Sequence, residues 1–78
     1  MVKFTQRELK DLVLYGNAWD ISDAKESDYW SIMNNEGNLK RIGYSCGTYG
    51  CNGLLLQGGK TGRLYAITKR TTAIYLFG

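Results

Sequence analysis

The first apolar stripe of the chain predicts a helix over residues 5–15. Leu9, Leu12 and Val13 recur at intervals that place their side chains on one helical face. Thr5, followed three positions later by a glutamate, is typical of a capping box, in which two side chains satisfy free N–H groups of the first turn. This helix therefore has a defined start and a defined inner face.

A second helical pattern spans residues 23–34, and Ser22 or Asp23 is expected to cap it. The candidate inner face of this helix consists of Ala24, Tyr29 or Trp30, Ile32 and Met33. In the connector before it, Trp19 and Ile21 are expected to fold back onto the core.

In the second half of the chain apolar and polar residues alternate at every second position, which indicates strands. The predicted strands are residues 39–46, 54–57, 63–69 and 72–77, with a hairpin loop over 57–62. In the first of them, alternation places Ile42, Tyr44 and Cys46 on one side and Arg41, Gly43 and Ser45 on the other.

This order of elements predicts an α+β fold, in which two N-terminal helices pack on one face of a four-stranded antiparallel sheet. The chain is expected to form a single domain, 1–78, with a helical part over 1–37 and a β-rich part over 38–78. A chain this short buries only about 60% of its unfolded surface, which favours association with a partner or as a homo-oligomer.

Charge is distributed unevenly between these two parts. Residues 1–37 hold four basic and seven acidic side chains, a net charge of −3. Residues 38–78 hold no acid and six basic residues, which are Lys40, Arg41, Lys60, Arg63, Lys69 and Arg70. Such asymmetry favours an anionic partner for the β-rich part, although the acidic helices can also simply neutralise it within the fold.

The composition favours a cytoplasmic protein. No apolar run approaches the roughly 20 residues that a membrane-spanning helix needs, so no membrane partner is expected. The opening residues, MVKFTQREL, contain no apolar signal-peptide segment. In a reducing compartment the two cysteines are expected to be thiols.

Cys46 and Cys51 could form a zinc site or a redox motif, or they could be apolar packing residues, and the last role fits best. A structural zinc ion needs four Cys or His ligands, and the chain has two cysteines and no histidine. A thioredoxin-type motif needs two intervening residues, and here there are four. Small apolar packing within a hairpin is therefore favoured, and whether the two cysteines pair is left open. No metal and no cofactor are expected.

The residue types for common catalytic mechanisms are missing. Without histidine there is no ordinary Ser-His or Cys-His pair. The seven carboxylates lie in the helical part, on faces expected to be solvated. An enzyme is the least favoured class, and no catalytic residue is assigned.

The glycine-rich segment 43–53 admits two interpretations. Exposed N–H groups in such a turn can form a nest for a phosphate, with Tyr44, Tyr49 and Asn52 supplying rings and an amide. The alternative, which is favoured, is a tight turn between strands with the tyrosines in the core.

The basic residues of the last predicted hairpin fall at both of its ends. Lys60 and Arg63 lie at one end, and Lys69, Arg70 and Thr71 at the other. This placement suits a basic stripe for phosphate or nucleic acid, or two half-sites completed in an oligomer. The alternative is a solvated face on which charges protect sheet edges.

The stretches LVLYGNAWDIS and IGYSCGTYGCNGLLLQGGKTGRLYAITKRTTAIYLF, which cover most of the chain, resemble small proteins carried by phages and mobile elements of Gram-positive bacteria. The resemblance is to the anti-defence, anti-CRISPR-like kind. It implies a stoichiometric inhibitor that binds a bacterial immune effector or sequesters a nucleotide immune signal. The resemblance does not imply any set of catalytic residues.

The resulting hypothesis is an inhibitor whose basic β-rich part engages an immune effector protein or its nucleic acid. Three alternatives remain: a sponge for a cyclic-nucleotide or ADP-ribose-type signal, a small nucleic-acid-binding protein, and an assembly protein without a ligand. The candidate binding residues are Arg41, Tyr44, Tyr49, Asn52, Lys60, Arg63, Lys69, Arg70 and Thr71.

Overall fold

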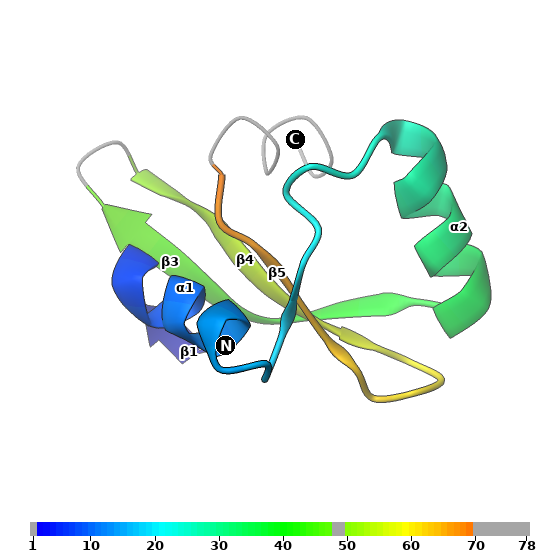
Figure 1. The fold of residues 1–78 in the computed structure, drawn as a ribbon, viewed down its shortest axis with the longest axis horizontal. Coiled ribbons are helices and arrows are strands. Elements are labelled where there is room, and N and C mark those ends of the chain that lie inside the picture. Colours follow the sequence, from blue (N-terminus) through cyan, green and yellow to red (C-terminus); the bar gives the residue numbers. More distant parts are fainter. Residues whose placement is uncertain (1, 48–49, 70–78) are drawn as a thin grey trace.

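A computed structural model describes residues 2–47 and 50–69 of the chain, and within these it contains two helices and a five-stranded sheet (Figure 1). The elements in chain order are β1 (Val2–Phe4), α1 (Gln6–Leu14), β2 (Trp19–Asp20), α2 (Glu26–Glu36), β3 (Leu39–Gly47), β4 (Gly50–Gly58) and β5 (Leu64–Ile67). The α+β class predicted from the sequence is therefore confirmed. Neither helix is long and apolar enough to cross a lipid bilayer.

The sheet is mixed, with strand order β1-β3-β4-β5-β2. Its centre is the antiparallel series β3, β4 and β5, while β1 pairs parallel to β3 and β2 pairs parallel to β5. The predicted four-stranded antiparallel sheet is wrong in this respect. The two edge strands have three and two residues, too few for an alternating pattern to be visible in the sequence. The predicted strand 72–77 lies outside the described residues.

The two helices pack against opposite faces of the sheet, whereas the sequence analysis placed both on one face. Leu55 of β4 shares an apolar cluster with Leu9 of α1, whereas its neighbours Leu54 and Leu56 belong to the cluster that Ile32 of α2 joins. Successive side chains of a strand point to opposite faces, so each helix covers a different face. In Figure 1, α1 lies across the end of the sheet formed by β1 and β3, and α2 lies at the far end of the molecule.

The start of α1 is the predicted one. The backbone N–H of Glu8 donates to the Thr5 hydroxyl at 3.1 Å, and the N–H of Thr5 donates to the Glu8 carboxylate at 3.3 Å. This reciprocal pair is a capping box. Leu9 is fully buried, as the helical stripe predicted.

The start of α2 differs from the prediction. Lys25 occupies the N-cap position, and its N–H donates to the carboxylate of Asp28 at 3.2 Å. Ser22 does not cap the helix, because its side chain is buried against the end of β5. Of the expected inner face, Ile32 packs on the core, but Trp30 is 55% exposed.

A β-bulge in β3 interrupts the predicted alternation. Arg41 is paired with Leu56, and Gly43 with the adjacent Leu55, so one additional residue is inserted into β3 between them. Ile42 consequently packs with the α1 cluster and Tyr44 with the α2 cluster. The expectation that these two side chains share one face is therefore wrong.

Candidate functional site

A cavity of about 270 Å³ opens where β2, the end of α2 and the β4–β5 turn meet. Its lining residues are Trp19, Ile21, Ile32, Asn35, Glu36, Thr61, Arg63 and Tyr65. Apolar and aromatic walls with a few polar groups are typical of small-molecule sites. We call this cavity the Trp19 pocket.

Trp19 reaches the pocket because β2 pairs with β5. Trp19 is in register with Tyr65, and the N–H of Ile21 donates to the carbonyl of Ala66 at 2.9 Å. The Trp19 and Tyr65 ring centroids are 6.5 Å apart in an edge-on arrangement. Trp19 is 56% exposed, so the expectation that it folds into the core is wrong, whereas Ile21 is buried as expected.

Arg63 lies flat over this tryptophan. Its guanidinium carbon is 3.9 Å from the centroid of the Trp19 ring, which is a cation–π contact. The contact fixes the position of a side chain that is otherwise exposed at the end of the hairpin. It places a positive charge at the rim of the Trp19 pocket.

Glu36, the last residue of α2, forms the polar wall of the pocket. Its carboxylate accepts hydrogen bonds from the Thr61 N–H at 3.0 Å, the Thr61 hydroxyl at 2.6 Å and the Tyr65 hydroxyl at 3.0 Å. Glu36 is only 3% exposed, so the expectation that all the carboxylates are solvated is wrong. A Cβ on Gly58 would lie 1.9 Å from this carboxylate, which explains a glycine at the end of β4.

The surroundings of Glu36 and Tyr65 shift the pKa values of these two groups in opposite directions. The hydroxyl of Thr61 lowers the pKa of Glu36 most, with smaller contributions from the Thr61 N–H, Tyr65 and Arg63, and desolvation opposes them. Desolvation, followed by the hydrogen bond to Glu36, raises the pKa of Tyr65. At neutral pH the carboxylate is therefore ionised and the phenol is protonated.

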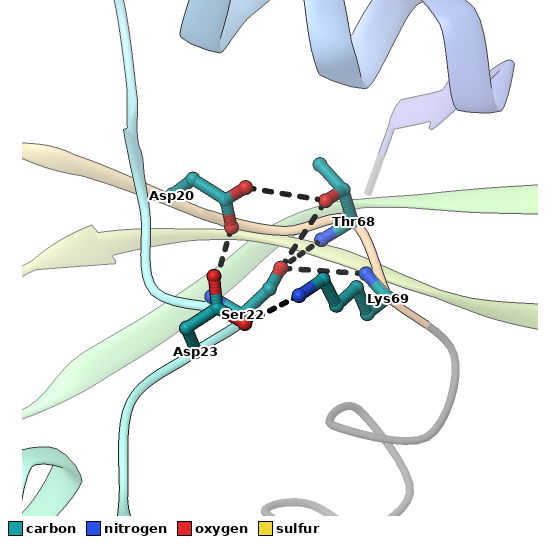
Figure 2. Close-up of polar contacts among 5 residues, drawn as sticks. All are labelled: Asp20, Ser22, Asp23, Thr68 and Lys69. Carbon is teal, nitrogen blue, oxygen red and sulfur yellow. Dashed lines mark hydrogen bonds and ion pairs between the residues drawn. The ribbon is translucent and has the colours of Figure 1, made fainter.

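A second polar cluster holds β2 against the end of β5 (Figure 2). The Ser22 hydroxyl oxygen accepts the backbone N–H groups of Thr68 at 2.8 Å and Lys69 at 3.3 Å. Asp20 accepts the Ser22 N–H at 2.8 Å and the Thr68 hydroxyl at 3.3 Å. Lys69 forms an ion pair with Asp23. Because Ser22 is buried and its oxygen is an acceptor for backbone groups, the cluster fixes the position of β2 and hence of Trp19.

The glycine-rich segment is largely strand. Gly47 and Gly50 are paired across the β3–β4 hairpin, and Gly53 lies within β4. A Cβ on Gly53 would be 2.0 Å from the hydroxyl oxygen of Ser45, so this glycine permits close packing. Cys46 and Cys51 lie on the neighbouring strands β3 and β4. Among the residues that the structure describes, no group of three potential metal ligands occurs.

The structure brings few of the predicted binding residues together. Arg63 lines the Trp19 pocket, and Lys60 lies in the adjoining turn. Of the others, Arg41 is exposed on β3, Tyr44 is half-buried against the core, Asn52 lies in β4, Lys69 is at the opposite end of β5, and Tyr49, Arg70 and Thr71 lie outside the described residues.

The sequence analysis did not select most of the pocket. The lining residues outside its set of candidate binding residues are Trp19, Ile21, Ile32, Asn35, Glu36, Thr61 and Tyr65. The available signal was a tryptophan in a connector together with a basic hairpin loop, but nothing local in the sequence places the two side by side.

The chain matched no protein-family model, no curated protein and no solved structure in the comparisons.

Proposed function

We propose that this protein acts by binding, and that the Trp19 pocket takes a nucleobase of an anionic, nucleotide-containing partner. The observation that carries the proposal is the Arg63 guanidinium stacked 3.9 Å from the centre of the Trp19 ring at the rim of the cavity. Proteins stack unpaired bases on the flat faces of aromatic rings and of arginine guanidinium groups.

The size of the pocket supports one base as the occupant. Its volume of about 270 Å³ is at the lower end of the range of roughly 300–1,000 Å³ that small-molecule sites occupy. A base can therefore enter while the sugar and phosphate stay outside. The amide of Asn35, an exposed residue at the rim, offers both a donor and an acceptor to a base edge.

The charges around the pocket support a phosphate outside it. Arg63 and Lys60 lie in or beside the same turn, and residues 38–78 contain no acid. Glu36 is the one carboxylate among the described residues that line the pocket, and its three hydrogen bonds already stabilise its negative charge. Phosphate groups are bound well by arginine and lysine together.

In this proposal the biological role is that of an anti-CRISPR-like, phage-type inhibitor acting in the host cytoplasm. The nucleotide then belongs to the nucleic acid of an immune effector. In a second form it belongs to a small signal of the cyclic-nucleotide or ADP-ribose type that the protein sequesters. The one-base volume of the pocket favours a stacked base of a single strand over a whole dinucleotide.

The test uses Trp19 as its own reporter. In a Trp30→Phe background, fluorescence is titrated with adenosine monophosphate and with an oligothymidylate of about ten nucleotides, a length within the usual binding-site sizes. We expect quenching of Trp19. Arg63→Gln should weaken oligonucleotide binding and reduce the slope of log affinity against log salt by about one.

Arg7→Gln is the matched control, because Arg7 is an exposed arginine of α1, which covers the face of the sheet opposite the pocket. Equal losses in Arg63→Gln and Arg7→Gln would show that binding does not use the pocket. Tighter binding of the mononucleotide than of the oligonucleotide would favour the sponge over the nucleic-acid form.

A further inference from the structure

The outer edge of β1 is a free strand edge within the described part of the chain. Among the described strands, β1 is terminal in the sheet order and pairs only with β3. Val2 is 59% exposed there. An unpaired edge presents N–H and C=O groups that can pair with another extended chain.

A groove beside this edge runs along one side of α1. It has a volume of about 230 Å³ and is lined by Phe4, Glu8, Asp11, Leu12, Tyr15 and Asn17. Counted from Glu8, Asp11 and Leu12 of α1 and its C-cap residue Tyr15 follow at three, four and seven positions, so they share one helical face. Phe4 is the last residue of β1 and therefore connects the strand edge to the groove.

The groove combines an apolar surface with two carboxylates. Glu8 and Asp11 are its two carboxylates, and the basic residues of the same helix, Arg7 and Lys10, are not part of its lining. Among the described residues, the Asp11 side chain has no hydrogen-bond or ion-pair partner. Tyr15, at 75% exposure, adds an aromatic face.

We propose that β1 and this groove form a docking site for an extended, basic segment of a protein partner, which adds to the sheet beside β1. Backbone pairing would hold the segment, and alternate side chains would enter the groove. Arginine suits these positions, because its aliphatic stem packs on Leu12 and Tyr15 while its guanidinium meets the carboxylates.

The charge of the groove argues against a second copy of this chain as the occupant. Pairing of two β1 edges would bring two copies of the Glu8 and Asp11 carboxylates to one interface, and like charges there are unfavourable. The docking site uses other residues than the Trp19 pocket, so this inference goes beyond the proposed function and does not depend on it.

The test is an NMR titration of backbone amides with a capped six-residue peptide of alternating valine and arginine. We expect binding with a Kd below about 1 mM and shifts confined to Val2–Phe4 and α1. Asp11→Asn should weaken binding about tenfold, as expected for loss of a charged hydrogen-bond partner. Glu26→Gln, at an exposed acid of α2, is the matched control and should leave affinity unchanged.

Two further peptides make the test specific to strand addition. A peptide with alternating valine and glutamate should not bind, and an N-methylated version of the basic peptide, which cannot donate backbone hydrogen bonds, should lose binding. The proposal would be overturned by any of three results. These are undiminished binding of the N-methylated peptide, equal losses of affinity in Asp11→Asn and Glu26→Gln, and the absence of chemical-shift changes at β1.

Discussion

The hydroxyl of Tyr65 donates a hydrogen bond to the carboxylate of Glu36 across 3.0 Å, and this contact joins the last turn of α2 to β5. Thr61 donates to the same carboxylate from the β4–β5 turn. One acidic side chain thus connects a helix, a turn and a strand around the Trp19 pocket. The hydrogen bonds that connect these three elements are strongest when this carboxylate is ionised.

We predict that Glu36 makes the stability of the fold depend on pH. Its pKa in the folded state lies below the ordinary value of 4.5 that applies to the unfolded chain, chiefly because of the Thr61 hydroxyl. The stabilisation is therefore complete above that ordinary value and is lost as pH falls through the lower, folded pKa. Urea unfolding between pH 7 and pH 3 measures this effect.

Glu36→Gln should lower the urea midpoint at pH 7 and flatten its dependence on acidic pH, since a glutamine cannot ionise. Glu26→Gln, at an exposed position of the same helix, is the control and should preserve the wild-type pH profile. A Glu36→Gln profile parallel to that of the wild type would assign the acid sensitivity to other groups.

Leu9 should be the residue of α1 on which stability depends most. It is fully buried in the cluster with Leu55 and Ala66, so Leu9→Ala removes apolar contacts and leaves a cavity. We expect a loss of about 2–5 kcal/mol in the free energy of unfolding. Leu14→Ala in the same helix, at a position 73% exposed, should change it by no more than about 0.5 kcal/mol. Similar losses in both would mean that α1 does not pack as described.

The capping box of α1 gives a smaller, independent prediction. Thr5→Ala removes the acceptor for the Glu8 N–H and should cost about 0.5–2 kcal/mol of stability. Thr5→Ser retains a hydroxyl at the same place and should recover most of that loss. Chemical denaturation compares the two, and an equal loss in Thr5→Ser would point to the methyl group of Thr5 instead of its hydroxyl.

Part of this fold was accessible from the sequence because its signals are local. The start of α1 rests on residues within one turn of each other, and the antiparallel order of β3, β4 and β5 follows from short connections between strands. The sequence also contains a signal for the placement of the two helices on opposite faces of the sheet. The continuous apolar run Leu54, Leu55, Leu56 is typical of a strand that is buried on both faces.

The site was less accessible because its contacts are long-range. Charge pointed to Arg63, but Trp19 reaches it only through β2, a strand of two residues that pairs with β5. Glu36 is buried because Thr61 donates to it from 25 positions further along the chain. Neither the β2–β5 pairing nor the Glu36–Thr61 contact produces a periodic or compositional pattern in the sequence. Local patterns therefore could not predict that these side chains lie together.

Gly43 should be required for the attachment of β1. A Cβ at this position would lie 2.3 Å from the ring carbon Cε2 of Phe4 and 3.1 Å from the carbonyl oxygen of Val2, so Gly43→Ala must move the Phe4 ring and crowds the backbone of β1 against β3. Overpacking of this kind costs about 1–3 kcal/mol. We expect faster amide hydrogen exchange in Val2–Phe4, with little change in β5, because the described contacts of β1 are mainly with β3 and α1.

Phe4→Leu in the Gly43→Ala background removes the ring that clashes and should restore part of the lost protection, so the two substitutions should be non-additive. Gly43→Ala alone should also weaken the binding of the basic peptide, because the peptide is proposed to add to the edge of β1. Slow exchange at Val2–Phe4 in Gly43→Ala would contradict the close approach of Phe4 to Gly43. Additive losses in the double variant would show that the two residues do not interact.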